Sequence, residues 1–226
     1  MSRRQRLTRL RHPAWLGTLR RTTPRSDHWG FDRGTPVDRY YIERFLERNR
    51  ERIRGRVVEV RDAAYTRRFG SGVTSSDVLD VDASNPDATI VADLAAADDV
   101  EAATFDCFIL TQTLQYIFDF EAALGHVHRI LRPGGTLLCT VPVVSRIGRQ
   151  EIESEFWRFT PAACSAIFEG AFQGGEVEVR GCGNALTCVA FLMGLAAEEL
   201  KPGELESDDP FFPLLVTVRA TKAAGD

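Results

Sequence analysis

The chain has 226 residues, 44% of them hydrophobic, so it is long enough to bury one sizeable core as a single domain. Its net charge of −4 shows no overall excess of Lys and Arg, and we expect no nucleic-acid partner. No apolar run reaches the roughly 20 residues that a membrane span needs. The longest such run, residues 185–197, is interpreted as a buried helix.

Residues 1–28 form a basic leader, because eight arginines precede the first acid, Asp27. These arginines are Arg3, Arg4, Arg6, Arg9, Arg11, Arg20, Arg21 and Arg25, and the apolar residues between them are Leu7, Leu10, Trp15, Leu16 and Leu19. Such a leader is either a solvated tail or a short amphipathic helix that makes weak peripheral contact with an anionic surface or partner. The main domain is expected over residues 29–226.

Helical spacing of apolar residues among charged ones predicts a helix over residues 37–53. After it, short apolar runs alternate with helix-like segments, which favours a parallel sheet covered by helices on both faces. The expected strands are residues 56–60, 73–77, 89–92, 105–110 and 136–141.

The final part of the chain has a different order of elements. A helix over residues 120–131 ends in Pro133, Gly134 and Gly135, which turn the chain into the next strand. The remaining expected elements are a helix over 161–169, a strand over 176–180, a buried run after Asn184, an acidic loop over 204–209 and a strand over 214–221. Two late strands close together predict an antiparallel edge on the parallel sheet.

The cysteines are odd in number and form no Cys-x-x-Cys pair, so they indicate neither a disulfide framework nor a zinc site. They are Cys107, Cys139, Cys164, Cys182 and Cys188. We expect a reduced, cytoplasmic protein with no bound metal.

Two sequence phrases resemble a known family. The first is Phe105-Asp106 with an apolar strand and a helix, then Leu131-Arg132-Pro133-Gly134-Gly135 before the next strand. It is similar to the region after the cofactor site in class I S-adenosylmethionine-dependent methyltransferases. The second, residues 156–161 (Phe-Trp-Arg-Phe-Thr-Pro), resembles a segment of the type 11 methyltransferase subgroup.

The resemblance implies a Rossmann-like α/β fold with a seven-stranded mixed sheet of order 3-2-1-4-5-7-6. It also implies S-adenosyl-L-methionine as cofactor, lying across the carboxyl ends of strands one to four, where open α/β sheets bind ligands. In the family, the acid at Glu59 supports the first loop and the methionine amino group.

The resemblance further implies one acid for the ribose and another for the adenine. Asp77 is our choice for the ribose hydroxyls, because an ionised carboxylate accepts two strong hydrogen bonds. Asp80 and Asp82 are alternatives. Asp93 matches the acceptor of the adenine amino group and Leu94 the backbone donor to the ring, although each of these acids could equally be a loop or helix cap.

Three further segments are expected around the pocket. Thr111 and Gln112, at the end of strand four, match its floor, or else simply close the strand. Residues 29–54 resemble an N-terminal lid, in which Tyr40 is a candidate substrate contact. Trp157 and Arg158, after strand five, are also candidate substrate contacts, with packing of the Trp as the alternative.

The first loop departs from the family pattern acid-x-Gly-x-Gly-x-Gly, since Arg61 stands where the first glycine is expected. Glycines let backbone amides approach the ligand and adopt positive φ. At Arg61 a positive φ would cost about 1 kcal/mol or more. Arg61 either turns outward, pairs with the methionine carboxylate of the cofactor, or fills the pocket and prevents binding.

Methyl transfer depends mainly on positioning, so the sequence says little about the acceptor. We expect a small molecule such as a sugar or a secondary metabolite. His28 and Asp38 are weak catalytic candidates, whereas His126 and His128 are assigned to packing. The alternative is a catalytically silent domain that serves as a binding or scaffold partner; a nicotinamide oxidoreductase is disfavoured because Gly-x-Gly-x-x-Gly is absent after strand one.

Overall fold

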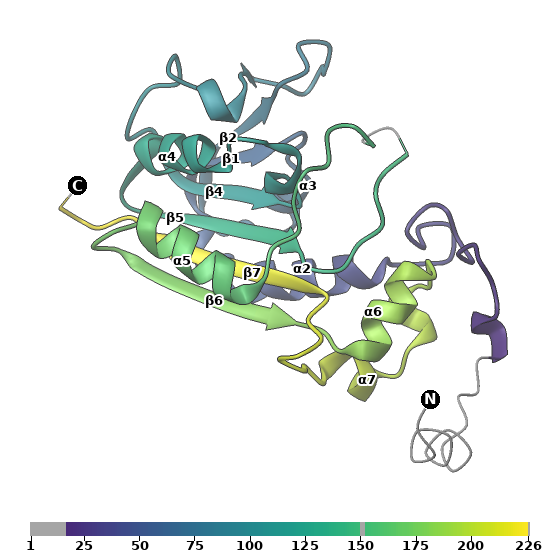
Figure 1. The fold of residues 1–226 in the computed structure, drawn as a ribbon. Coiled ribbons are helices and arrows are strands. Elements are labelled where there is room, and N and C mark those ends of the chain that lie inside the picture. Colours follow the sequence, from purple (N-terminus) through teal and green to yellow (C-terminus); the bar gives the residue numbers. More distant parts are fainter. Residues whose placement is uncertain (1–16, 150–151, 226) are drawn as a thin grey trace.

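A computed structural model of the protein describes residues 17–149 and 152–225. These residues form one seven-stranded sheet of order β3-β2-β1-β4-β5-β7-β6 (Figure 1). Its strands are β1 (Gly55–Val60), β2 (Val73–Asp80), β3 (Ile90–Val91), β4 (Phe105–Thr111), β5 (Leu131–Pro142), β6 (Glu176–Cys182) and β7 (Leu215–Thr221). The pairs from β3 to β5 are parallel, and β7 is antiparallel to both β5 and β6. The predicted sheet order and antiparallel edge are confirmed.

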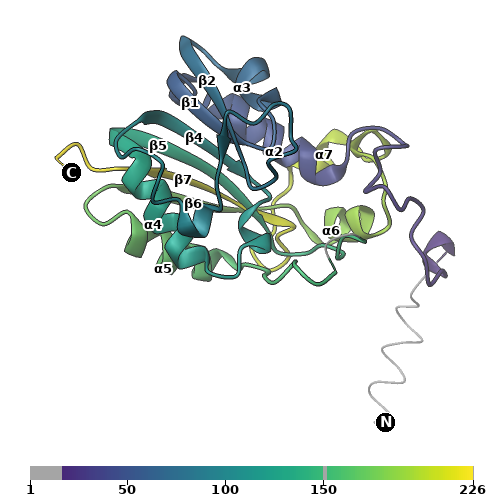
Figure 2. The same cartoon turned by 90° about the horizontal axis from the view of Figure 1, so that it is seen from above.

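Helices cover both faces of the sheet (Figures 1 and 2). They are α2 (Val37–Arg48), α3 (Ala64–Phe69), α4 (Phe120–Ile130), α5 (Pro161–Ala171), α6 (Ala185–Leu192) and α7 (Pro202–Glu206). Short 3₁₀ turns lie at Gly17–Leu19, Arg50–Arg52, Leu94–Ala96, Leu114–Tyr116 and Ala197–Glu199. None of the helices in these described segments is long and apolar enough to cross a membrane.

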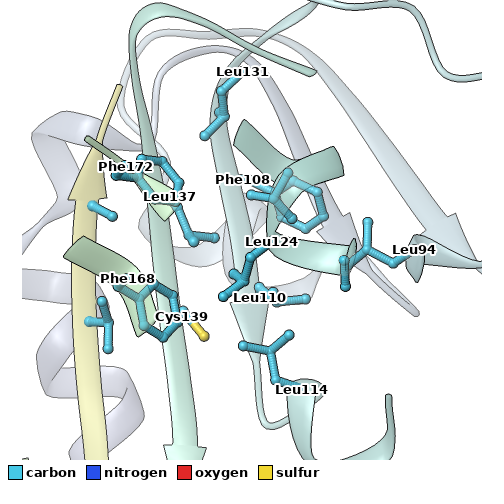
Figure 3. Close-up of a cluster of buried hydrophobic side chains, with 14 of the residues drawn as sticks. Leu94, Phe108, Leu110, Leu114, Leu124, Leu131, Leu137, Cys139, Phe168 and Phe172 are labelled. Carbon is cyan, nitrogen blue, oxygen red and sulfur yellow. The ribbon is translucent and has the colours of Figure 1, made fainter. Parts of the chain in front are cut away.

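The central strand β4 is buried on both faces, and its side chains alternate between two cores. Phe108 and Leu110 pack under α4 and α5, together with Leu124 and Phe168 (Figure 3). Cys107 and Ile109 point to the opposite face, into the core that contains residues of α2, α3 and α6. Side chains of a strand point alternately to its two faces. Because both faces of β4 are buried, its sequence is almost continuously apolar.

Local signals fix where the helices begin and where the chain turns. Asp119 accepts a hydrogen bond from the Ala122 amide at 3.0 Å, and Thr160 accepts one from the Ala163 amide at 3.1 Å. Such N-caps satisfy amides that have no partner in the first helical turn. At Gly135, which lies inside β5, a Cβ would be 2.8 Å from the Arg132 carbonyl oxygen, so the close approach of the backbone there requires glycine.

Several expected boundaries were wrong. β2 continues for three residues beyond Asp77, the 37–53 helix ends at Arg48 before a 3₁₀ turn, and residues 204–206 belong to α7 rather than to a loop. Residues 1–16, which hold most of the basic leader, lie outside the described residues. Within residues 25–28, also assigned to the leader, Ser26 is buried and the Arg25 amide donates to the Met193 carbonyl at 2.7 Å.

Lys222 is a buried cation at the base of the sheet, and we expect Lys222→Met to destabilise the protein. Its Nζ donates to the carbonyl oxygens of His128 and Leu131, at 3.0 and 3.2 Å, where α4 ends and β5 begins. Methionine keeps the apolar stem but leaves these carbonyls without their charged donor, which costs about 1–3 kcal/mol. Urea unfolding measures the loss, with the exposed Arg67→Met as the control; equal stability of the two variants would contradict this role.

Candidate active site

A cavity of about 540 Å³ opens at the carboxyl ends of the central strands. Arg61 follows β1, Gln112 follows β4 and Pro142 ends β5, and all three line it. Residues 27–39 supply another wall. The volume lies within the range of small-molecule sites, and the position agrees with the sequence-based expectation for the fold.

Arg61 adopts the conformation that the missing glycine would have provided. Its φ is +75°, in the left-handed region, and its amide donates to the Leu79 carbonyl at 3.0 Å. The carbonyl of Arg61 accepts a hydrogen bond of 2.7 Å from Asn85 Nδ2. The side chain is exposed at the cavity, and the guanidinium forms no ion pair with any residue that the structure describes. The backbone at Arg61 is therefore strained, while the cavity beside it stays open.

Glu59 holds the loop that follows β1. Its carboxylate accepts hydrogen bonds from the amides of Tyr65 and Thr66, at 3.1 and 2.8 Å, and from the Thr66 hydroxyl at 2.8 Å. Burial raises the pKa of Glu59 above its usual range in spite of these bonds. The Glu59 side chain thus joins the end of β1 to the start of α3.

The structure does not bring Asp77 to the edge of the sheet where a ribose would lie. Asp77 faces Val58 across the β1–β2 pair, and its carboxylate forms an ion pair of 2.8 Å with Arg56 Nε. The residue that ends β2 is Asp80, one of the two alternatives. Its Oδ2 accepts a 2.6 Å hydrogen bond from Asn85, which therefore bridges Asp80 and the Arg61 carbonyl.

Asp93 and Leu94 occupy structural positions at the end of β3. Asp93 is the N-cap of the following 3₁₀ turn and accepts a hydrogen bond from the Ala95 amide at 2.9 Å. Leu94 is buried in the core under α4 (Figure 3). Neither residue lines the 540 Å³ cavity, so an adenine contact at this position stays a prediction.

Of the two residues expected on the floor, Gln112 lines the cavity and Thr111 does not. Gln112 has a φ of +49°, and its amide donates to the Thr140 carbonyl at 2.8 Å. Its side chain Nε2 lies 3.4 Å from Thr140 Oγ1. The turn after β4 thus presents a side-chain amide to the cavity.

The lid packs against the segment that follows α6. Gly30 has a φ of +94°, and a Cβ there would lie 2.7 Å from the Leu195 carbonyl oxygen. The Thr35 carbonyl accepts a hydrogen bond from the Ala197 amide at 2.7 Å. His28 and Asp38, the catalytic candidates, line the cavity from this lid. Tyr40 does not: it lies among residues of α2 in two other surface hollows, so the expected substrate contact is not supported by its position.

Asp38 is the acid of the cavity without a cationic side chain bound to it. Its Oδ1 accepts a hydrogen bond of 2.8 Å from the adjacent Arg39 amide, while the Arg39 guanidinium donates to the Tyr65 hydroxyl. Burial raises the pKa of the Asp38 carboxyl. A desolvated carboxylate of this kind is a suitable proton acceptor.

Trp157 and Arg158, expected to contact substrate, are held by the protein itself. Trp157 Nε1 donates to the Ile117 carbonyl at 3.1 Å, and its ring packs edge to face with Phe120. Arg158 forms an ion pair of 2.8 Å with Glu155. Neither lines the cavity, whereas Glu155 does. Trp157 therefore has the packing role that was the alternative to a substrate contact.

Sequence analysis missed two arginines that follow β5. Arg146 and Arg149 both line the same cavity as Arg61. Their position after a strand whose carboxyl end faces the ligand edge was the available signal, but basic residues in a loop are usually solvated. The described residues contain no group of three or more side chains able to hold a metal ion.

Comparison with known proteins agrees with this architecture. Residues 60–139 match the family model of a methyltransferase domain. Among solved structures, a SAM-dependent methyltransferase from Archaeoglobus fulgidus has a TM-score of 0.52 at 10% identity, covering 81% of this chain and 94% of its own. An S-adenosylmethionine-dependent methyltransferase from Mesorhizobium loti has a TM-score of 0.52 at 18% identity, covering 85% and 100%. No curated protein matches the chain.

The matched segment runs from the end of β1 into β5, and it agrees with the sheet order, which is that of the class I methyltransferase fold. At identities this low the solved structures establish the fold alone. The [4+2]-cyclase SpnF also matches, with a TM-score of 0.56 at 15% identity, covering 85% of this chain and 84% of its own. Because one fold supports different reactions, the function has to be argued from the site.

Proposed function

We propose that this protein is an S-adenosylmethionine-dependent methyltransferase that acts on a small-molecule acceptor. The observation that carries the proposal is Arg61, whose φ of +75° gives the loop after β1 the backbone of a glycine while leaving the cavity open. A side chain that merely filled a lost cofactor site would be expected inside the protein. Arg61 is instead exposed at the cavity.

The residues at the tips of β1 and β4 fit the methionine end of the cofactor. The Arg61 guanidinium suits the carboxylate, because charge-assisted bonds between these groups are strong. Gln112 offers a side-chain amide on the opposite side. When bound, the cofactor supplies a methyl group on a sulfonium, which the acceptor nucleophile takes while the electron pair of the broken S–C bond stays on sulfur.

The ribose acid is reassigned from Asp77 to Asp80, because Asp80 ends β2 and Asp77 is paired with Arg56 inside the strand. Asp80 Oδ2 already accepts a 2.6 Å hydrogen bond from Asn85, so ribose hydroxyls would use the remaining acceptor positions of this carboxylate or displace Asn85. Asp38 is proposed to accept a proton from the acceptor, and His28 lies in the same wall of the cavity. The five cysteines of the chain are free and buried, which supports the expectation of a reducing, cytoplasmic setting.

A silent binding domain is the second candidate, and the Asn85 bridge favours it. Asn85 joins the Arg61 carbonyl to Asp80, so it ties the tips of β1 and β2 together where the ribose is expected. If this bridge does not open, the domain keeps the fold without the cofactor.

Calorimetric titration with S-adenosylhomocysteine separates the two candidates. We expect binding in the wild-type protein and a loss of about 10-fold or more in affinity for Asp80→Asn, because a neutral amide accepts weaker hydrogen bonds than a carboxylate. Asp77→Asn is the matched control: it removes a partly exposed ion pair, worth at most about 1 kcal/mol of stability, and should leave affinity unchanged. No heat in the wild type, together with no thermal stabilisation at millimolar ligand, would favour the silent domain.

A further inference from the structure

Near the loop that follows β5, some of the charged side chains that line the cavity have partners of opposite charge and one does not. Both acids there already have cationic partners: Asp27 forms an ion pair with Arg149, and Glu155 forms one of 2.8 Å with Arg158. Glu155 also accepts a hydrogen bond of 3.0 Å from the Gly148 amide. These acids therefore have little capacity left to neutralise another cation.

Of the arginines near these two acids, Arg146 is not ion-paired with either of them. Its Cζ lies 3.7 Å from the centre of the Trp29 ring, and one Nη donates to the carbonyl oxygen of Asp27. It forms no ion pair with an acid in residues 17–149 or 152–225. Its Nε is buried without a hydrogen-bond partner there. Stacking on Trp29 fixes the guanidinium plane without reducing its charge.

The proposed cofactor does not account for this second cation. Its single carboxylate is assigned to Arg61 at the tip of β1, whereas Arg146 follows β5. An unpaired guanidinium held in place beside a cavity can bind an anion through its remaining Nη donors, because charge-assisted hydrogen bonds to a carboxylate or phosphate are strong. Asp38, in the same cavity, needs a hydrogen-bond donor.

We propose that the methyl acceptor is an anionic small molecule whose carboxylate or phosphate is bound by Arg146 on Trp29, while its hydroxyl or amino group faces Asp38. This inference rests on the proposed methyl transfer, but the anion site is a property of the protein's own residues. It narrows the acceptor from the neutral sugars considered above to acids and phosphorylated compounds.

The test uses three matched probes that share one ring and hydroxyl group: 4-hydroxybenzoate, 4-hydroxyphenyl phosphate and the neutral 4-hydroxybenzamide. Each is titrated by NMR into the full chain, with and without S-adenosylhomocysteine. We expect at least one anion to bind 10-fold or more tightly than the amide. Whichever anion binds more tightly shows whether the acceptor carries a carboxylate or a phosphate.

Variants assign the preference to Arg146. In Arg146→Gln the anion preference should fall below threefold, whereas in Arg67→Gln, which removes an exposed cation outside the cavity, it should remain. Circular dichroism checks that both variants are folded. Equal binding of anions and amide, no saturation by either anion, or a preference that survives Arg146→Gln would overturn the proposal. The proposed function is tested separately: it would fail if the wild-type protein did not bind S-adenosylhomocysteine.

Discussion

Arg61→Ala and Arg61→Gly are both expected to bind S-adenosylhomocysteine about 10- to 100-fold more weakly than the wild-type protein. The expected loss corresponds to one charge-assisted pair between the guanidinium and the ligand carboxylate, worth about 1.5–3 kcal/mol. Isothermal titration calorimetry measures it directly. Unchanged affinity in both variants would mean that the side chain points away from the ligand.

The same two variants separate the side chain from the backbone. Both lack the guanidinium, and they differ only by a Cβ on a residue whose φ is +75°. Glycine adopts this conformation freely, so Arg61→Gly should be more stable than Arg61→Ala by about 1 kcal/mol in urea unfolding. Similar affinities with different stabilities would show that the strained loop serves to present the guanidinium. If Arg61→Gly instead bound more tightly than the wild type, the arginine would be an obstacle to the cofactor.

The sheet order was predictable from the family resemblance, whereas the local patterns predicted a parallel sheet with an antiparallel edge. Apolar runs alternated with helical spacing along the chain. The Arg132-Pro133-Gly134-Gly135 segment was expected to precede the strand, but β5 begins at Leu131 and includes it. A few adjacent residues determine each helix and strand, so a single sequence carries that part of the information.

The positions of the ribose acid and of the acceptor residues were not predictable in the same way. β2 has an exposed stretch at Ser75 and Ser76, so its apolar pattern does not show where it ends; pairing of Val60 with Leu79 sets that limit. Trp157 contacts Ile117 and Phe118 across some 40 positions. Arg146 becomes recognisable as a site residue only when the lid places Trp29 against it. These assignments depend on tertiary contacts between distant segments.

Asp38→Asn is expected to make the protein more stable at pH 8 and to lose this advantage in acid. Burial raises the pKa of Asp38, so the folded protein holds this proton more tightly than the unfolded chain does. Stability from the protonated carboxyl is fully present below the unfolded pKa, about 3.9, and is lost as the pH rises through the folded pKa. At pH values above both the unfolded and the folded pKa, the charged carboxylate lowers the free energy of unfolding of the wild type. The loss is about 1.4 kcal/mol for each tenfold increase in proton affinity on folding.

Asparagine carries no charge at any of these pH values and keeps an oxygen for the Arg39 amide. When urea unfolding is followed upward from pH 4, the stability difference between Asp38→Asn and the wild type should therefore increase until the pH exceeds the folded pKa of Asp38 and level off above it. Asp99→Asn, at an exposed acid, is the control and should show no such trend. A difference that stays constant or shrinks with rising pH would contradict the buried charge. A site that keeps this carboxylate at a cost in stability is one in which the carboxylate is needed, as expected for a residue that accepts a proton from the substrate.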